Sequence, residues 1–116
     1  MKNQRNTTSN RPARMASTVQ TMVAQILRER FGDDGLLGGV SLVGATARGG
    51  TQFVHLYYYS RNSDIAAVQR RLDEVTKTIR YELASRLNQK YVPDIKFEYD
   101  DTLDRAERLD KILENL

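Results

Sequence analysis

Apolar residues recur at helical spacing near the start of the chain. They stand three or four positions apart, as on one face of an amphipathic helix, and are Met15, Val19, Met22, Val23, Ile26 and Leu27. Pro12 suits the first turn of a helix, because its missing N–H would have no partner there in any case. Gly32 can adopt the left-handed conformation that ends a helix, and Asp33-Asp34-Gly35 is typical of a turn. The pattern therefore predicts a helix over about residues 12–31.

Two β-rich runs follow, from Val40 to Ala47 and from Phe53 to Tyr59. The residues between them, Arg48-Gly49-Gly50-Thr51, are typical of a short hairpin loop. The sequence therefore predicts an antiparallel pair of strands.

The second of these runs alternates in character, and alternate residues of a strand point to opposite faces of a sheet. One face carries Val54, Leu56 and Tyr58, which we expect to contact the helices. The other face carries only ring side chains, namely Phe53, His55, Tyr57 and Tyr59. These rings suit stacking on unpaired bases. They would equally well cover the sheet, and this structural role is favoured.

A longer helix is predicted after Asn62, Ser63 or Asp64, each of which can cap a helix. Its apolar stripe continues for about six turns through Ile65, Val68, Leu72, Val75, Ile79, Leu83 and Leu87. This length indicates either one long helix or two helices joined by a kink.

The opposite face of the long helix is basic. At about 100° per residue, Arg70, Lys77, Tyr81 and Asn88 fall together there, with Arg80 to one side. Two glutamates intervene along the same helix. The face is therefore either a binding patch or an ordinary solvated surface.

Pro93 interrupts the helical pattern, and Ile95, Phe97 and Tyr99 then alternate with charged residues as a third short strand. A last helix is predicted after Asp100-Asp101-Thr102, with apolar positions at Leu103, Ala106, Leu109, Ile112, Leu113 and Leu116. The order helix, strand, strand, long helix, strand, helix indicates one α+β domain, in which helices cover a three-stranded sheet. We expect the domain to cover residues 11–116 and residues 1–10 to form a disordered basic tail.

Positive charge is concentrated in the first part of the chain. Residues 1–90 hold 14 Lys and Arg against 7 Asp and Glu, whereas residues 91–116 hold 4 against 8. A segregated basic surface attracts polyanions and releases counterions on meeting phosphate, so nucleic acid is a natural candidate partner. The chain has no cysteine and no apolar run of the roughly 20 residues that a membrane span needs, which favours a reducing cytoplasm. The basic, acid-free first 28 residues leave an organelle stroma or matrix as the alternative.

The sequence offers little for catalysis. His55 is the only histidine and lies in the middle of a predicted strand, and no cysteine is present to act as a nucleophile. No phosphate-binding loop or dinucleotide fingerprint occurs. Acidic residues between Asp100 and Asp110 could attract magnesium, but acids at a helix start also stabilise the helix dipole without a metal. We expect neither an enzyme nor a bound metal or cofactor.

Several motifs resemble those of a known family. They are Arg11-Pro12-Ala13-Arg14, Ile79-Arg80 with Leu83-Ala84, Tyr91-Val92-Pro93-Asp94-Ile95-Lys96-Phe97, and Asp100-Asp101-Thr102-Leu103-Asp104-Arg105. With these motifs the chain resembles ribosome-binding factor A over about residues 11–114, most specifically from Ile79 onward. Its element order resembles the KH domain of type II connectivity. The family's kink signature is replaced here by Val75-Thr76-Lys77, and Gly35-Leu36-Leu37-Gly38 is interpreted as a chance match to the GxxG loop of KH domains.

The resemblance implies a monomeric cytoplasmic factor that binds the immature 30S subunit and its 16S rRNA and assists maturation of the rRNA 5′ end. It also implies a role in cold adaptation, and ribosomal proteins and an assembly GTPase as possible further partners. The side chains expected to contact RNA phosphates are Arg11, Arg14, Arg70, Lys77, Arg80, Arg86 and Lys90. Arg86 has an alternative partner in Glu82, four positions earlier. A protein-interaction module and a general RNA-binding KH-like module are the alternative functions.

Overall fold

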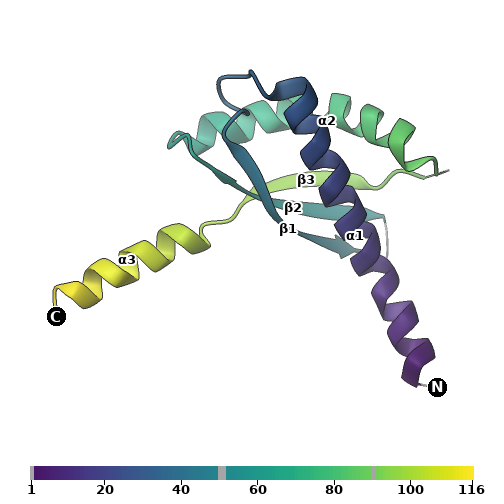
Figure 1. The fold of residues 1–116 in the computed structure, drawn as a ribbon, viewed down its shortest axis with the longest axis horizontal. Coiled ribbons are helices and arrows are strands. Elements are labelled where there is room, and N and C mark those ends of the chain that lie inside the picture. Colours follow the sequence, from purple (N-terminus) through teal and green to yellow (C-terminus); the bar gives the residue numbers. More distant parts are fainter. Residues whose placement is uncertain (1, 50–51, 90) are drawn as a thin grey trace.

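The computed structural model describes residues 2–49, 52–89 and 91–116. Its elements, in chain order, are α1 (Lys2–Phe31), β1 (Val40–Arg48), β2 (Phe53–Ser60), α2 (Ile65–Leu87), β3 (Asp94–Tyr99) and α3 (Thr102–Glu114). The α+β class and the order of the elements are as predicted, and this order agrees with type II KH connectivity. Figure 1 shows α1 and α2 on one side of the sheet and α3 projecting away from it.

The sheet has the strand order β1-β2-β3. The predicted pairing of β1 and β2 is confirmed as antiparallel, with a bulge between Leu42 and Gly44 that leaves Val43 without a paired residue on β2. β3 lies parallel to β2, so that Leu56 stands opposite Phe97. Parallel neighbours need a long crossover connection, and α2 supplies it.

The core lies between the sheet and the two helices. Val54, Leu56 and Tyr58 are all fully buried, which confirms the predicted helix-facing side of β2. The Tyr58 hydroxyl donates a hydrogen bond of 2.7 Å to Gln69 on α2, and burial raises the pKa of Tyr58 to about 12. The two helices, β3 and the loop after α1 contribute Ala16, Val19, Val23, Ile26, Leu27, Leu37, Val68, Leu72, Val75, Ile79, Leu83, Ile95 and Phe97.

α2 is one continuous helix, and no break occurs at Val75-Thr76-Lys77. Its N-cap is Asp64, whose side chain accepts a hydrogen bond from the Ala67 N–H at 3.1 Å. Its C-cap is Asn88, in the left-handed conformation with φ of 53°. The Thr76 hydroxyl donates to the Leu72 carbonyl one turn earlier, which satisfies the hydroxyl within the helix. Of the two alternatives that the sequence left open, the structure has the single long helix.

α1 begins earlier than expected. It starts at Lys2 and includes Pro12 in its interior, whereas the apolar pattern predicted a start near Pro12. The prediction relied on apolar periodicity, which begins only at Met15, so the sequence carried no signal for the preceding turns. The assignment of residues 1–10 to a tail and of residues 11–116 to the domain stays a prediction.

α3 leaves the body of the domain directly after β3 (Figure 1). None of its residues is buried, and its apolar side chains Leu103, Leu109, Ile112 and Leu113 are each more than half exposed. The Tyr99 hydroxyl donates a hydrogen bond of 2.7 Å to Asp104 and so ties the first turn of α3 to the end of the sheet. The last helix therefore exists as predicted but does not help to cover the sheet.

Candidate nucleic-acid interface

Arg11 and Arg14 lie on the exposed side of α1 and line a groove of about 400 Å³ with Met15 and Thr18. Gln89, just after α2, forms the other wall of this groove. Neither arginine makes a hydrogen bond or ion pair with another described residue. The fold therefore places the predicted cations of the N-terminal segment beside the end of α2. Lys90, the remaining predicted cation of this region, lies outside the described residues.

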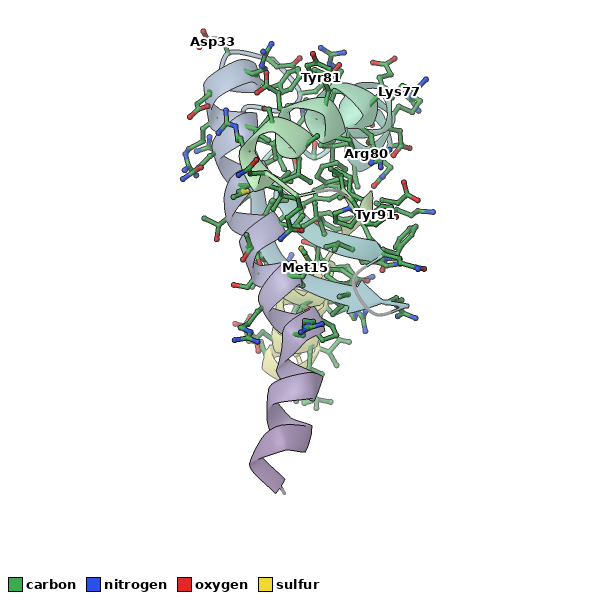
Figure 2. All side chains as sticks on the ribbon, turned by 90° about the vertical axis from the view of Figure 1, so that its right-hand side faces the viewer. Met15, Asp33, Lys77, Arg80, Tyr81 and Tyr91 are labelled. Carbon is green, nitrogen blue, oxygen red and sulfur yellow. The ribbon has the colours of Figure 1, made fainter. Side chains whose placement is uncertain are left out.

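Arg70 and Lys77 lie on the exposed side of α2, as the helical pattern predicted. Within the described part of the chain, neither side chain has a hydrogen-bonding or ionic partner. Figure 2 shows Lys77 and Tyr81 on the outer side of α2, away from the strands, with Arg80 pointing lower, toward Tyr91. Arg70 and Lys77 are therefore available for phosphate without any internal contact being broken.

Arg80 is instead bonded to the backbone. Its guanidinium donates to the carbonyls of Val92 and Pro93, both at 3.3 Å, and approaches the Asp94 carboxylate at 3.3 Å. These contacts hold the segment that leads into β3 against α2. Arg80 therefore positions the segment before β3. To bind a phosphate, its guanidinium would have to give up its contacts with Val92, Pro93 and Asp94.

Arg86 is also held internally. Its guanidinium donates to Glu29 of α1 at 2.5 Å and lies 3.8 Å from Glu82, the alternative partner expected from the sequence. The hydrogen bond from Arg86 lowers the pKa of Glu29 and raises the pKa of Arg86. Glu82 in turn pairs with Arg30, so four charged side chains join α1 to α2. Arg86 therefore acts first as a bridge between the helices.

The loop after α1 uses its amide groups internally. The Asp34 carboxylate accepts hydrogen bonds from the N–H groups of Leu36 at 2.9 Å and Leu37 at 3.0 Å. Its second oxygen accepts from Arg71 on α2 at 2.9 Å. A Cβ placed on Gly38 would stand 2.7 Å from the Gly32 carbonyl oxygen, so close packing accounts for this glycine. In the segment that resembles a GxxG loop, the N–H groups of Leu36 and Leu37 therefore donate to the preceding Asp34 carboxylate and are not free to bind a phosphate.

The ring side chains of β2 lie on the sheet face opposite the helices and contact one another. Ring centroids are 5.0 Å apart for Phe53 and His55 and 6.3 Å apart for His55 and Tyr57. The Tyr57 hydroxyl lies 3.3 Å from the Thr46 hydroxyl on β1. All of these rings are half-buried. These contacts agree with the favoured interpretation, in which the rings cover the sheet.

The acidic residues before and within α3 have local partners. Asp100 accepts hydrogen bonds from the Thr102 N–H and hydroxyl, which lower the pKa of Asp100. Asp101 pairs with Arg105 at 2.6 Å. In the part of the chain that the structure describes, no group of three or more potential metal ligands lies together. Among the same residues, no helix combines the length and the apolar character that a membrane span needs. These acids therefore serve the start of α3.

Arg30 was missed by the reasoning from sequence. It lies at the end of α1 and, with Lys77, Thr78, Tyr81 and Glu82, lines a groove of about 490 Å³ on the outer side of α2. No periodic pattern joins residues of two different helices, so only the packing of α1 against α2 reveals this neighbour.

Comparison with known proteins identifies the family. A family model described as ribosome-binding factor A matches residues 11–113. The chain belongs to the ribosome-binding factor A family. The ribosome-binding factor A of Limosilactobacillus fermentum is 35% identical over 109 residues, which cover 91% of this chain and 90% of that protein. The earlier resemblance is thereby confirmed.

Solved structures of ribosome-binding factor A share the fold. The crystal structure of the Thermus thermophilus protein superposes with a TM-score of 0.66 at 14% identity, covering 76% of this chain and 94% of that one. A Thermus thermophilus ribosome-binding factor A, fitted as a homology model into a cryo-EM map of a 30S complex, gives a TM-score of 0.56 at 15% identity. It covers 72% of this chain and 92% of the other.

Proposed function

We propose that this protein associates with the immature 30S ribosomal subunit, binds its 16S rRNA and assists maturation of the 5′ end of that rRNA. The observation that carries the proposal is the family match over residues 11–113. A relative of the same fold has been fitted into a map of a 30S complex, which supports the small subunit as the partner. The exposed cations on α1 and α2 supply a surface suited to RNA.

The proposed binding is electrostatic and does not involve covalent chemistry. Arg11 and Arg14 approach phosphates from the groove beside Gln89, and Arg70 and Lys77 do so from the outer side of α2. Such contacts position a protein on RNA without reading the base sequence, while the shape of the two partners decides where it docks. Arg80 and Arg86 contribute by holding α2 against β3 and α1.

The C-terminal part has the opposite charge and a different proposed role. Residues 91–116 hold 4 Lys and Arg against 8 Asp and Glu, and α3 projects from the domain. Like charge keeps this end away from phosphate. A basic ribosomal protein or an assembly GTPase that releases the factor would be a compatible neighbour.

Replacing Lys77 with glutamate should weaken binding to small subunits. The change removes one phosphate contact and adds a repulsive charge, so the slope of log K against log salt should fall by more than about one unit. The measurement is co-sedimentation with purified 30S and 50S subunits over a range of salt concentrations. Wild-type protein should migrate with 30S subunits only and dissociate as salt rises.

The matched control is Lys96→Glu, which makes the same charge change at an exposed position of β3, outside the predicted phosphate contacts, and should leave 30S binding unaltered. An unchanged salt slope for Lys77→Glu would remove Lys77 from the interface. Equal binding of wild-type protein to both subunits would indicate a general polyanion binder. Binding to neither subunit would favour the protein-interaction module.

Depletion of the protein in its host should leave 16S rRNA precursors with unprocessed 5′ ends. The defect should increase in the cold, because non-productive rRNA structures are harder to melt at low temperature. Primer extension on rRNA from depleted cells at two growth temperatures measures it. Normal 5′ ends at both temperatures would contradict the processing role while leaving 30S binding untouched.

A further inference from the structure

We propose that the groove beside Tyr81 binds one unpaired RNA nucleotide, with the Tyr81 ring as the stacking surface and Lys77 at the phosphate. The groove is the one of about 490 Å³ lined by Arg30, Lys77, Thr78, Tyr81 and Glu82. The inference rests on the proposed function and adds to it a preference for single-stranded over double-stranded RNA.

Tyr81 is an unusually exposed aromatic residue on α2. Its relative exposure is 80%, so little of the side chain can be packed against the rest of the domain. In the described part of the chain it has no ring partner, hydrogen bond or ion pair. By contrast, Phe53, His55 and Tyr57 on the sheet are half-buried against one another. An exposed ring on a basic surface offers a planar apolar face on which any base can stack.

Cationic side chains flank the ring on two sides, Lys77 without an ionic partner among the described residues and Arg30 paired with Glu82. Lys77 lies one helical turn before Tyr81 on the same side of α2, where Figure 2 shows both side chains directed outward. Arg30 reaches the groove from α1 and pairs with Glu82. Glu82 would repel a phosphate on its own, but its ion pair with Arg30 offsets that charge. Arg86, which bonds Glu29, lies 3.8 Å from the Glu82 carboxylate. Lys77 has no such partner among the described residues and so can bind a phosphate.

The geometry favours an unpaired nucleotide over a duplex. In an A-form helix the base faces are buried by stacking, and only backbone and groove edges are presented to a protein. A duplex could contact Lys77 through its phosphates but could not cover the Tyr81 ring. A bulged or single-stranded nucleotide can satisfy both groups at once.

The test compares Tyr81→Ala with Tyr81→Phe in the full chain. The probes are a single-stranded RNA of about eight nucleotides and the same strand in a duplex, with binding measured by fluorescence anisotropy. The alanine variant should bind the single strand roughly 5- to 150-fold more weakly and the duplex as well as wild type does. The phenylalanine variant should retain wild-type binding, because it keeps the ring. The salt slope should not change, since no charge is removed.

Single-strand binding by Tyr81→Ala equal to that of wild type would overturn the inference, and so would an equal loss on both probes. If Lys77→Glu still weakens 30S binding in that case, the proposed function stands without the stacking site. If Lys77→Glu also leaves 30S binding and its salt slope unchanged, the proposed function loses its interface too. The thermal midpoint of Tyr81→Ala should match that of wild type because the ring is 80% exposed.

Discussion

Replacing Phe97 with alanine should lower the free energy of unfolding by about 3–5 kcal/mol. Phe97 is 1% exposed and stands opposite Leu56 in the parallel pairing of β2 and β3. Truncation loses the buried ring surface and leaves a cavity that the surrounding helices can fill only partly. Because small domains are stable by only about 5–15 kcal/mol, much of the margin would be lost.

Urea denaturation followed by circular dichroism measures this loss. The control is Lys96→Ala on the same strand, where an exposed side chain on the opposite sheet face should change stability by no more than about 0.5 kcal/mol. If Phe97→Ala lowers the free energy of unfolding by less than about 1 kcal/mol, the side chains around β3 must rearrange to fill the cavity, which the observed packing does not predict.

Replacing Asp34 with alanine should lower the free energy of unfolding by about 2–3 kcal/mol. One carboxylate accepts hydrogen bonds from the N–H groups of Leu36 and Leu37 and from the Arg71 guanidinium. Removing it leaves two loop amides without their acceptor and takes one of two carboxylate partners from Arg71, which keeps its contact with Glu74 at 3.2 Å. Part of this loss is offset because water reaches the loop, which keeps the expected loss below the sum of three charged hydrogen bonds.

The contribution of Asp34 should depend on pH. Burial alone would raise the pKa of Asp34, but the Leu37 and Leu36 amides and Arg71 outweigh it, and the pKa lies below its ordinary value. A lowered pKa in the folded state stabilises the fold above the ordinary pKa, and this stability is lost as pH falls through the folded pKa. The difference between wild type and Asp34→Ala should therefore be full at neutral pH and shrink below about pH 4.

Asp33→Ala is the matched control, since this neighbouring carboxylate is exposed and should have little effect on stability. Urea denaturation at neutral and acidic pH distinguishes the two variants. Two results would show that other contacts hold the loop. One is an equal loss in free energy of unfolding for Asp33→Ala and Asp34→Ala. The other is a stability difference between wild type and Asp34→Ala that does not vary with pH.

Asp34 also explains why the Gly35–Gly38 segment, interpreted from the sequence as a chance match to a GxxG loop, does not present its amides to phosphate. The letters Gly35-Leu36-Leu37-Gly38 match a phosphate-binding pattern, yet a motif of this kind binds phosphate only if its amides are free. Here the aspartate immediately before it already accepts two of them. In the sequence, Asp33 and Asp34 directly before the motif already indicated that its amides would be occupied by a carboxylate.

The sequence by itself determined the order of the elements and most residues of the core, although the apolar stripe of α3 is exposed. Each apolar stripe repeats within one element, with a period of about 3.6 residues in helices and 2 in strands, so burial leaves a local and readable trace. The same periodicity placed Lys77 and Tyr81 together on α2. It could not detect the first turns of α1, which lie before the apolar pattern begins.

Only the tertiary structure decided which cations are available for RNA. Arg30 and Glu82 meet across 52 positions of sequence, and Arg86 and Glu29 across 57. Contacts between distant residues leave no period in the chain, so the sequence assigned Arg70, Lys77, Arg80 and Arg86 the same role. Packing separates them, because a guanidinium already bonded to a carboxylate or carbonyl must break that contact to reach a phosphate, whereas Arg70 and Lys77 need not.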